Sequence, residues 1–381
     1  MEYRLDELFD LQMGKTPSRN NPEYWNSEDH KWISIGDLSK CGKYILDTKE
    51  YLSDKAVQES GISCIPANTV IMSFKLSIGK IAFTKEPIYS NEAIMSFRDK
   101  HLVELLPDYI FYMFTGKDWE AGTNKAVMGK TLNKSTLSAI KVSIHPISEQ
   151  RKIVEVLDKV SSIIEDRQRE LTRLDELIKA RFVEMFGDCR ESISAGDFMH
   201  SLRNGVSPST SGKHHEKVLT LSAITQGQFD PNMWKDGMFD TVPVADKRIC
   251  STDFYMCRGN GNKSLVGTGV YSTEDRDDLV FPDTVIAAHV DTTRVCLPYL
   301  FVAWMQPGIR NQIEAGARTT NGTYKINQQI ISRIKVPLPT MHEQRQFAAI
   351  VAQVDKSKVA VQAALDKAQL LFDSLMQQYF G

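Results

Sequence analysis

The sequence predicts an α+β fold built as a tandem repeat, in which two β-rich globular domains are each followed by a long helix. Three observations lead to this prediction. Short motifs recur at one offset of 194 residues. Apolar residues in the two similar tails follow the spacing of a coiled-coil seam. Outside the tails, in both globular parts, short alternating strands and turn residues occur without the regular strand–helix alternation of a nucleotide-binding sheet.

The repeat rests on motif pairs that share this offset without a gap. Weaker matches with small gaps extend it toward the first residues of each copy. We therefore interpret the chain as a duplication, each copy a variable globular part followed by a similar tail. The pairs include Leu132-Asn133 and Ile326-Asn327, Ile140-Lys141-Val142 and Ile334-Lys335-Val336, Glu149-Gln150-Arg151 and Glu343-Gln344-Arg345, and, more weakly, Gly14-Lys15-Thr16-Pro17-Ser18 and Gly205-Val206-Ser207-Pro208-Ser209.

Each tail is predicted to be one helix of some 40 residues, roughly 60 Å long. Pro146 and Pro339 precede the helices, where proline is tolerated. The alternative is that each helix is buried separately against its own domain. Helices this long with a common register favour pairing with each other. The expected seam residues are Ile153, Leu157, Val160, Ile164, Leu171, Leu174, Ile178, Phe347, Val351, Val354, Val361, Leu365, Phe372 and Leu375.

The predicted organisation is therefore a first domain over 1–145, a helix over 146–187, a second domain over 188–338 and a second helix over 339–381. Within the domains we expect short strands bounded by glycine, proline and asparagine turns. The expected strands are Lys31–Ile35, Val70–Ser73, Lys80–Thr84, Lys217–Leu221, Val266–Tyr271 and Leu279–Ala287, with helices over Pro107–Thr115 and Leu297–Met305.

Composition sets limits on the class of protein. The formal net charge of -2 gives no support to nucleic-acid binding through overall charge, so such binding must depend on local patches. The six cysteines form no Cys-x-x-Cys pair, which indicates reduced cytosolic thiols. Without an apolar leader or a long apolar run, we expect a cytoplasmic protein with no membrane association.

No motif indicates catalysis. The loop Gly259–Ser264 lacks the glycine that precedes the lysine of a phosphate-binding loop. Asn21-Pro22-Glu23-Tyr24 lacks the second proline of an amino-methyltransferase loop and follows no cofactor-binding sheet. His289 with Asp291, and the pair His214-His215, do not have the spacing of metal ligands. We expect no cofactor and no bound metal.

Polar loops in both copies carry the hydrogen-bond donors that nucleic-acid recognition uses. The alternative is that they are ordinary solvated loops. Their recurrence at equivalent places favours a shared function, and the candidate DNA-binding residues are Lys15, Thr16, Ser18, Arg19, Asn20, Lys75, Ser77, Lys80, Asn124, Lys125, Lys130 and Thr131 in the first copy, and Ser207, Ser209, Thr210, Lys213, Arg258, Asn260, Asn262, Lys263, Arg318, Thr319, Thr320, Asn321, Thr323, Tyr324 and Lys325 in the second.

Domain, helix, domain and similar helix together resemble the specificity subunits of type I restriction-modification systems. The most specific element is Ile334-Lys335-Val336-Pro337-Leu338-Pro339 ahead of Glu343-Gln344-Arg345, which fits the family's Ile-x-Val-Pro-x-Pro and Glu-Gln-Arg pattern. The first copy departs from the pattern, with Ser143 and His145 where prolines are usual. The resemblance covers the whole chain.

The resemblance implies two target-recognition domains joined by antiparallel spacer helices. Each domain would read half of a split site in double-stranded DNA, with half-site centres about 10 bp apart. The helices would dock two methyltransferase subunits, and restriction subunits with motor activity would join them. The chain itself would be non-catalytic.

Two other interpretations stay open. The chain could be the recognition subunit of a type IIB-like enzyme, in which methyltransferase and nuclease are fused in another polypeptide. It could also be a coiled-coil adaptor, which predicts no sequence-specific DNA binding. An enzyme with an unrecognised site is a third and weaker alternative.

Overall fold

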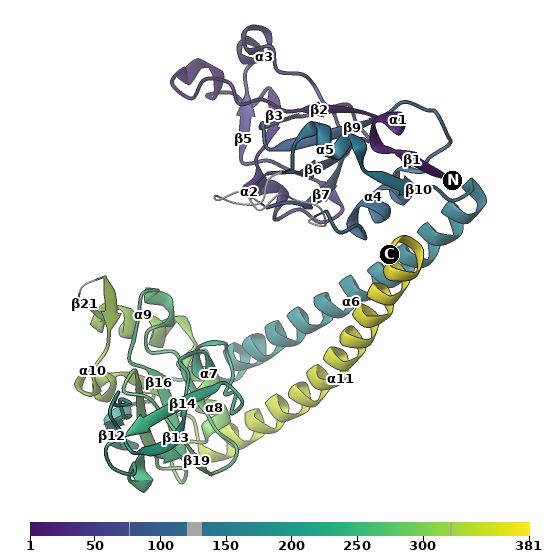
Figure 1. Ribbon diagram of the computed structural model, residues 1–381. Helices are drawn as coiled ribbons and strands as arrows, with labels where there is room; N and C mark the ends of the chain where they lie inside the picture. Colours follow the sequence, from purple (N-terminus) through teal and green to yellow (C-terminus); the bar gives the residue numbers. More distant parts are fainter. Residues whose placement is uncertain (76, 120–131, 321) are drawn as a thin grey trace. The chain divides into compact units, whose positions relative to one another are not determined.

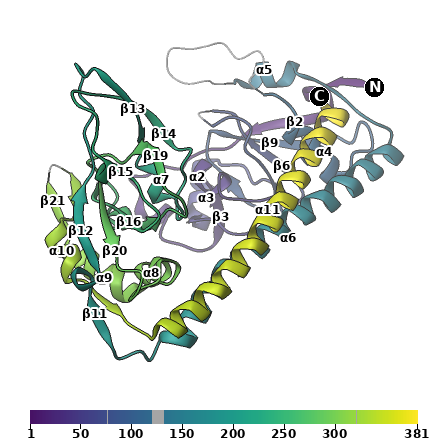
Figure 2. The same ribbon diagram turned by 90° about the horizontal axis from the view of Figure 1, so that it is seen from below.

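The computed structural model describes residues 1–75, 77–119, 132–320 and 322–381 (Figure 1). They divide into two compact units, unit 1 with Met1–Gln168 and Ala363–Gly381, and unit 2 with Arg169–Gln362. The helix α6 (Ile147–Phe186) begins in unit 1, where α11 (Met341–Phe380) ends. The two helices are therefore antiparallel, and Figure 2 shows them running alongside each other. The predicted mixture of β-rich domains and long paired helices is confirmed.

Unit 1 contains two main sheets, with strand orders β2-β9-β6-β7-β4 and β5-β3-β8. The central strand β6 is buried along its whole length, which suits its run of apolar residues. A short ladder joins β1 to β10, just before α6. The bounds are β1 Glu2–Arg4, α1 Leu5–Leu8, β2 Phe9–Met13, η1 Pro22–Tyr24, β3 His30–Ile33, α2 Ile35–Leu38, β4 Tyr44–Ile45, β5 Glu50–Leu52, α3 Asp54–Ser60, β6 Val70–Ser73, β7 Ile81–Thr84, β8 Tyr89–Ser90, β9 Ile94–Asp99, α4 Pro107–Thr115, α5 Lys134–Ala139 and β10 Lys141–Ser143.

Unit 2 repeats this plan with sheets ordered β12-β20-β16-β18 and β14-β13-β19-β15. It also has a small sheet ordered β17-β22-β21. The bounds are β11 Ser192–Ser194, η2 Ala195–Asp197, β12 Met199–Asn204, β13 His214–Leu219, α7 Ser222–Thr225, β14 Trp234–Phe239, η3 Ala245–Lys247, β15 Arg248–Ile249, β16 Asp253–Cys257, β17 Gly259–Asn260, η4 Lys263–Leu265, β18 Gly269–Tyr271, β19 Arg276–Val280, β20 Val285–Val290, α8 Leu297–Trp304, α9 Pro307–Gly316, β21 Arg318–Thr320, β22 Thr323–Lys325, α10 Gln328–Arg333 and β23 Lys335–Pro337.

The repeated sequence motifs take the same structural roles in both units. Asn133 caps α5 by accepting from the amide of Thr136 at 2.7 Å, and Asn327 caps α10 through Ile330 at 2.9 Å. Such caps satisfy amides that have no partner inside the helix. The ladder β1–β10 pairs Tyr3 with Val142, and β11–β23 pairs the equivalent residues Ile193 and Val336. The duplication is thus visible in hydrogen bonds as well as in sequence.

One strand prediction was wrong. The segment Leu279–Ala287 was expected to form a single strand, but it contains the end of β19 and the start of β20, which belong to different sheets. Between them lies Pro282, which has no amide hydrogen and disfavours continued pairing. The predicted strand Val266–Tyr271 is also shortened to β18, because Gly267 adopts a φ of 67° in the turn before it.

The expected seam residues of the long helices face inward within each unit. In unit 1, Ile153 and Leu157 share a core cluster with Met376 of α11. In unit 2, Ile178 shares a cluster with Phe347 and Val351. Of the predicted seam positions, Ile153, Leu157, Val160, Ile178, Phe347, Val351, Val354 and Val361 are buried, and Ile164, Leu171, Leu174, Leu365, Phe372 and Leu375 are half-buried.

The outer faces of these helices are largely charged. At the seam position Lys358, the side chain reaches out to the carboxylate of Asp175 on α6, with Nζ and Oδ1 2.5 Å apart. This arrangement keeps the charged group partly solvated while its aliphatic stem lines the seam. In the described part of the chain, no helix combines the length and the apolar character needed to span a bilayer.

The aromatic contact across the helix pair in unit 2 predicts a large stability effect. Phe347 is fully buried, with its ring centroid 5.5 Å from those of Phe182 and Phe186. Phe347→Ala should lower the free energy of unfolding by about 3–5 kcal/mol, because the lost ring leaves a cavity. The control Gln353→Ala, on the exposed face of α11, should change it by less than about 0.5 kcal/mol. Chemical denaturation measures both, and equal effects would contradict this seam.

Candidate nucleic-acid interface

In unit 2, two of the predicted polar loops meet in one small sheet. The pairing of β17 with β22 places Gly259 opposite Lys325 and Asn260 opposite Tyr324. The amide of Ile326 also donates to the carbonyl of Arg258 at 2.9 Å. The loop 258–263 and the strands β21 and β22, which are far apart in sequence, therefore contribute to one surface.

This surface carries two cations directly opposite each other. Arg318 pairs with Lys325 across the β21–β22 hairpin, and both side chains are exposed. Within the described residues, neither forms an ion pair with a carboxylate. Opposed like charges destabilise a hairpin, so a bound polyanion would relieve this repulsion. Gly259 leaves room beside them, because an added Cβ would lie only 3.2 Å from Cγ of Lys325.

The loop that follows β17 is rigidly held. The side-chain carbonyl of Asn260 accepts from the amide of Asn262 at 2.8 Å, and that of Asn262 accepts from the amide of Ser264 at 3.1 Å. Each asparagine therefore uses its acceptor internally and keeps its amide donors available. Lys263 is exposed and has no carboxylate partner among the described residues. It is the side chain in this loop best placed to meet a phosphate.

Arg258 sits deeper than the other cations. Its Nη1 donates to the carbonyl of Asp283 at 3.0 Å and lies 3.8 Å from the Asp283 carboxylate. This contact fixes the direction of the guanidinium while 36% of the side chain stays exposed. A fixed, partly exposed fork can present its remaining N–H groups to a base edge.

A residue that was not predicted from the sequence supports this loop. Arg310 of α9 donates through Nη2 to the carbonyls of Ser264 at 2.9 Å and Val266 at 3.0 Å. Only 12% of its side chain is exposed, and burial lowers its pKa. No local signal marks Arg310 in the sequence, since its partners lie more than 40 residues away.

The predicted loop between β12 and β13 is anchored by its backbone. The amide of Ser209 donates to Met238 at 2.8 Å and that of Lys213 to Phe239 at 2.9 Å. The side chains of Ser207, Thr210 and Lys213 are exposed and Ser209 is half-buried. These donors are therefore presented from a fixed frame.

The loops that follow β2 and β12 both start at a glycine whose backbone passes very close to a neighbouring segment. We call this close approach at Gly14 and at Gly205 the glycine crossing. The amides of Gly14 and Lys15 donate to Ile94 at 3.1 Å and Ser90 at 2.8 Å. The equivalent amides of Gly205 and Val206 donate to Val285 and Phe281 at 3.1 and 3.0 Å. A Cβ on Gly14 would lie 2.3 Å from the carbonyl oxygens of Ser90 and Asn91, and one on Gly205 2.1 Å from that of Phe281. Only glycine allows strands to approach this closely.

In unit 1, several predicted binding residues are already occupied. Arg19 stacks on Trp25, with Cζ 3.7 Å from the ring centroid, and holds Glu50 through both nitrogens of its fork. Lys15 donates to the carbonyl of Ser60, and Thr16 to the carboxylate of Glu92. The hydrogen bond from Thr16 lowers the pKa of Glu92. Ser18 and Asn20 stay exposed. Arg19 would have to release Glu50 before it could read a base bidentately.

The turn after β6 is the unit 1 counterpart of the loop at Arg258. The amide of Leu132 donates to the carbonyl of Phe74 at 3.0 Å, as that of Ile326 does to Arg258. Lys75 lies over the Phe74 ring at 5.1 Å, whereas Ser77 and Lys80 are exposed. The predicted residues Asn124, Lys125, Lys130, Thr131 and Asn321, and the side chain of Thr320, lie outside what the structure describes.

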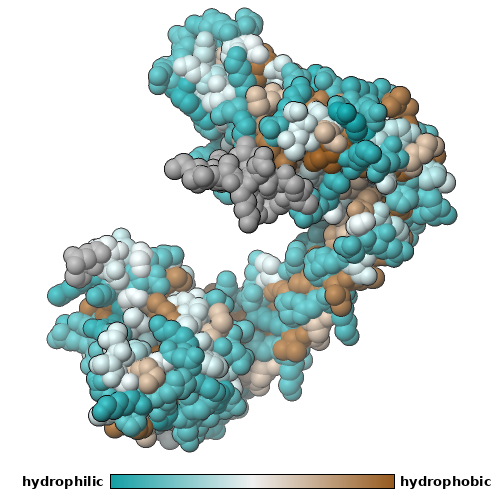
Figure 3. Space-filling model, in the orientation of Figure 1, coloured by the Kyte–Doolittle hydropathy of each residue, from teal (hydrophilic) through white to brown (hydrophobic). Residues whose placement is uncertain are grey.

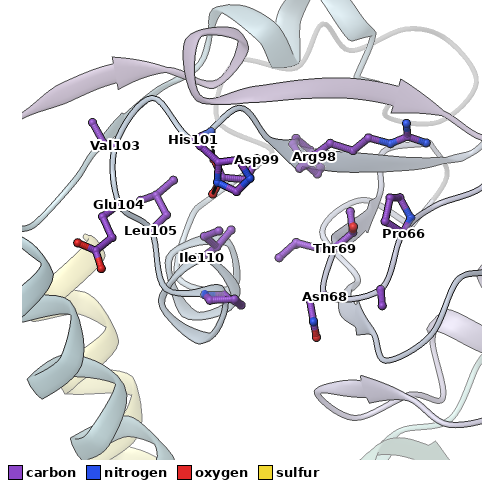
Figure 4. A pocket seen from close by; sticks show the side chains of 14 residues that line it. Pro66, Asn68, Thr69, Arg98, Asp99, His101, Val103, Glu104, Leu105 and Ile110 are labelled. Atoms are coloured by element: carbon purple, nitrogen blue, oxygen red, sulfur yellow. Dashed lines mark hydrogen bonds and ion pairs between the residues drawn. The ribbon is translucent and has the colours of Figure 1, made fainter.

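A separate cavity of about 610 Å³ lies in unit 1, between the start of β6, the end of β9 and the start of α4 (Figure 4). Arg98, Asp99 and His101 line it, but none of the predicted DNA-binding residues does. Arg98 donates to the carbonyl of Cys64 on its outer side. Among the residues that the structure describes, no group of histidine, cysteine and carboxylate side chains is arranged to hold a metal ion.

Known proteins share this sequence pattern and architecture. Residues 1–173 match the family model described as the type I restriction modification DNA specificity domain. The first copy of the repeat is therefore similar to the DNA specificity domain of type I restriction-modification systems. It is 26% identical over 189 residues to the type I restriction enzyme MjaIX specificity subunit of Methanocaldococcus jannaschii, and 28% identical over 186 residues to the EcoR124I/EcoR124II specificity subunit of Escherichia coli.

These matches are partial in sequence and complete in fold. They cover 49% and 47% of this chain, but only 43% and 45% of the two relatives, which is less than half of the length of each. The crystal structure of the type I S subunit from M. genitalium aligns over 100% of this chain and 96% of its own, with a TM-score of 0.55 and 13% identity. The specificity-subunit fold therefore extends over both repeats.

The glycine crossing predicts a local destabilisation. Gly205→Ala should lower the free energy of unfolding of unit 2 by about 1–3 kcal/mol, because its Cβ has to displace backbone. Gly308→Ala is the matched control, since nothing lies within 4 Å of its Cβ position in α9. That change should leave stability unchanged or raise it by about 0.4–1 kcal/mol. Thermal unfolding of the two variants gives the comparison, and an unaffected Gly205→Ala protein would contradict the crossing.

Proposed function

We propose that this chain reads a split, asymmetric DNA site as the specificity subunit of a type I restriction-modification complex. The carrying observation is that the two units present different side chains from the same scaffold positions. Lys15 and Val206 follow the equivalent glycines, and Phe74 and Arg258 occupy equivalent loop starts. The two units share a backbone framework but differ in the side chains that it presents. This combination suits two half-sites of different sequence.

The proposed division is target recognition by residues 1–145 and 188–338, with spacers over 146–187 and 339–381. In the second domain, Arg258 would address a guanine edge, and the free amide donors of the asparagines near it would address acceptors on neighbouring base edges. Lys263, Arg318 and Lys325 would hold phosphates and set the register on the duplex. The overall charge of -2 is no obstacle, because these cations are locally concentrated and unpaired in the described structure.

Apolar side chains on the outer faces of the long helices support docking of a partner. Leu177 of α6 is 43% exposed, and Leu371 of α11, at the equivalent place in the repeat, is 51% exposed. Figure 3 shows apolar patches that interrupt the polar surface of the helices. Equivalent patches on two repeated helices suit two copies of one partner. We assign these patches to two methyltransferase subunits, through which restriction subunits would join.

In this assignment the chain contributes recognition, and its partners contribute methyl transfer and cleavage. The site is a set of donors for DNA and needs no cofactor of its own. Since its substrate is chromosomal or incoming DNA, the chain would act in the cytoplasm.

Domain exchange tests this function. Residues 188–338 should be replaced by the equivalent segment of a relative, and the chain expressed with its methyltransferase. Methylome sequencing of the host should show one half-site replaced and the other retained, because the candidate binding loops of the second half-site all lie within the exchanged segment. A folded hybrid that changes both half-sites, or a wild type with no split methylation motif, would refute the proposal.

Two substitutions separate base reading from phosphate contact. Arg258→Ala should cost about 1–3 kcal/mol of binding and relax preference at one base pair. Lys263→Ala should weaken all sequences alike and reduce the salt slope by about one. Lys335→Ala is the control, since its Nζ donates to Ser194 in β11.

Binding of the assembled methyltransferase to oligonucleotides changed one base pair at a time distinguishes these effects. Unchanged affinity and base preference in both Arg258→Ala and Lys263→Ala would remove this loop from the interface.

Substitutions on the helices test partner docking. Leu177→Ser and Leu371→Ser should each weaken one methyltransferase site by about 1 kcal/mol, because roughly half of each side chain remains to be buried. That is roughly a fivefold rise in Kd. Lys179→Gln, about 200° around the helix from Leu177, is the control. Analytical ultracentrifugation should show the lowered stoichiometry, and full occupancy in the double leucine variant would place docking elsewhere.

A further inference from the structure

A glutamine side chain is completely buried in the first turn of each long helix. Gln150 and Gln344 are the middle residues of the repeated Glu-Gln-Arg motif, and both have 0% exposure. The adjacent residues of the motif, Arg151 and Arg345, are exposed. Burial of a polar amide is unfavourable unless its donors and acceptor are all used. The use of these groups therefore indicates what the motif does.

In unit 1, Gln150 joins α6 to two other segments of the domain. Its Oε1 accepts from the amide of Leu106 at 3.0 Å, and Leu106 is the N-cap residue that precedes α4. Its Nε2 donates to the carbonyls of Glu104 at 3.0 Å and His145 at 2.9 Å. One side chain thus ties the start of the spacer helix to the segment before α4 and to the strand exit before α6.

Gln344 repeats the same three bonds in unit 2. Its Oε1 accepts at 2.9 Å from the amide of Cys296, the N-cap residue that precedes α8. Its Nε2 donates to the carbonyls of Arg294 at 3.1 Å and Pro339 at 2.9 Å. The two sets of partners are equivalent in the repeat. We call each glutamine with its three backbone partners a brace.

A tyrosine reinforces each brace. The hydroxyl of Tyr109 in α4 lies 2.7 Å from Nδ1 of His145, and that of Tyr299 in α8 donates to the carbonyl of Pro337 at 2.8 Å. Both tyrosines are fully buried. Apolar contacts alone let a helix slide or tilt, whereas several buried hydrogen bonds at one point fix its direction.

We propose that Gln150 and Gln344 are positioning residues that fix the direction in which each spacer helix leaves its domain, and thereby set the one half-site spacing that the protein accepts. This inference rests on the proposed function. One added base pair shifts a half-site by about 3.4 Å along the duplex and turns it by about 35°. Domains on rigidly attached helices cannot follow both movements, but domains on loosened helices can.

The test uses the full chain assembled with its methyltransferase. Gln150→Glu keeps the acceptor for Leu106, loses both donors and places a carboxylate beside two carbonyl oxygens, so it breaks two of the three bonds of the brace. Methylation is measured on duplexes with the native spacer and with one base pair added or removed. The ratio of native to altered spacer should fall roughly tenfold, a change of about 1.4 kcal/mol, and Gln344→Glu should do the same.

Base preference within each half-site should not change, because the recognition loops lie elsewhere in each unit. This separates positioning from a general loss of structure, which would affect base preference and the native spacer alike. Gln346→Ala is the matched control, since Gln346 is exposed on α11 and bonds only His342 among the described residues. Wild-type spacer discrimination in both active glutamate variants would overturn the positioning role. Wild-type protein that requires no split site at all would overturn the proposed function instead.

Discussion

The structure depends on the apolar seam between the two long helices, because each helix also completes a domain core. Phe347 at the start of α11 belongs to the cluster that contains Trp304 and Phe254 of unit 2. Met376 near the end of the same helix belongs to the cluster of Phe97 and Tyr109 in unit 1. One helix thus has two ends buried in different cores, so that neither domain is complete without the segment that follows the other.

Rigid supports surround the variable surfaces of both units. The glycine crossings at Gly14 and Gly205 leave no space for a side chain, and the asparagine caps at Asn133 and Asn327 fix the helices beside the loops. The glycines and asparagine caps therefore fix the backbone of each unit, and the loop residues between them can differ without changing the fold. This division explains how one duplicated scaffold can carry two different recognition surfaces.

Part of the candidate site could be read from sequence and part could not. Donor-rich loops at equivalent places were visible because their composition is local. Pairing of Gly259 with Lys325, and support of that loop by Arg310, depend on residues far apart in the chain. The occupied state of Arg19 likewise arises from Glu50 and Trp25, which reach it only in the folded domain. The residue types in a loop indicate which side chains could bind DNA. Contacts with distant parts of the chain decide which of those side chains are still free to do so.

The sequence by itself determined the duplication, the long helices and their inward-facing residues. Heptad spacing and repeated motifs depend only on the order of residues along the chain, so they can be recognised without knowing which segments meet in the fold. The sequence left β19 and β20 joined in one expected strand, although Pro282 and Asp283 interrupt the apolar residues there, because only the pairing partners of the two strands show that they belong to different sheets. It also gave no role to Gln150 or to Lys43, whose Nζ bonds Asp108 at 2.6 Å and Asp158 at 2.8 Å. Only the tertiary structure decided these, because a buried polar group is defined by partners that folding brings to it.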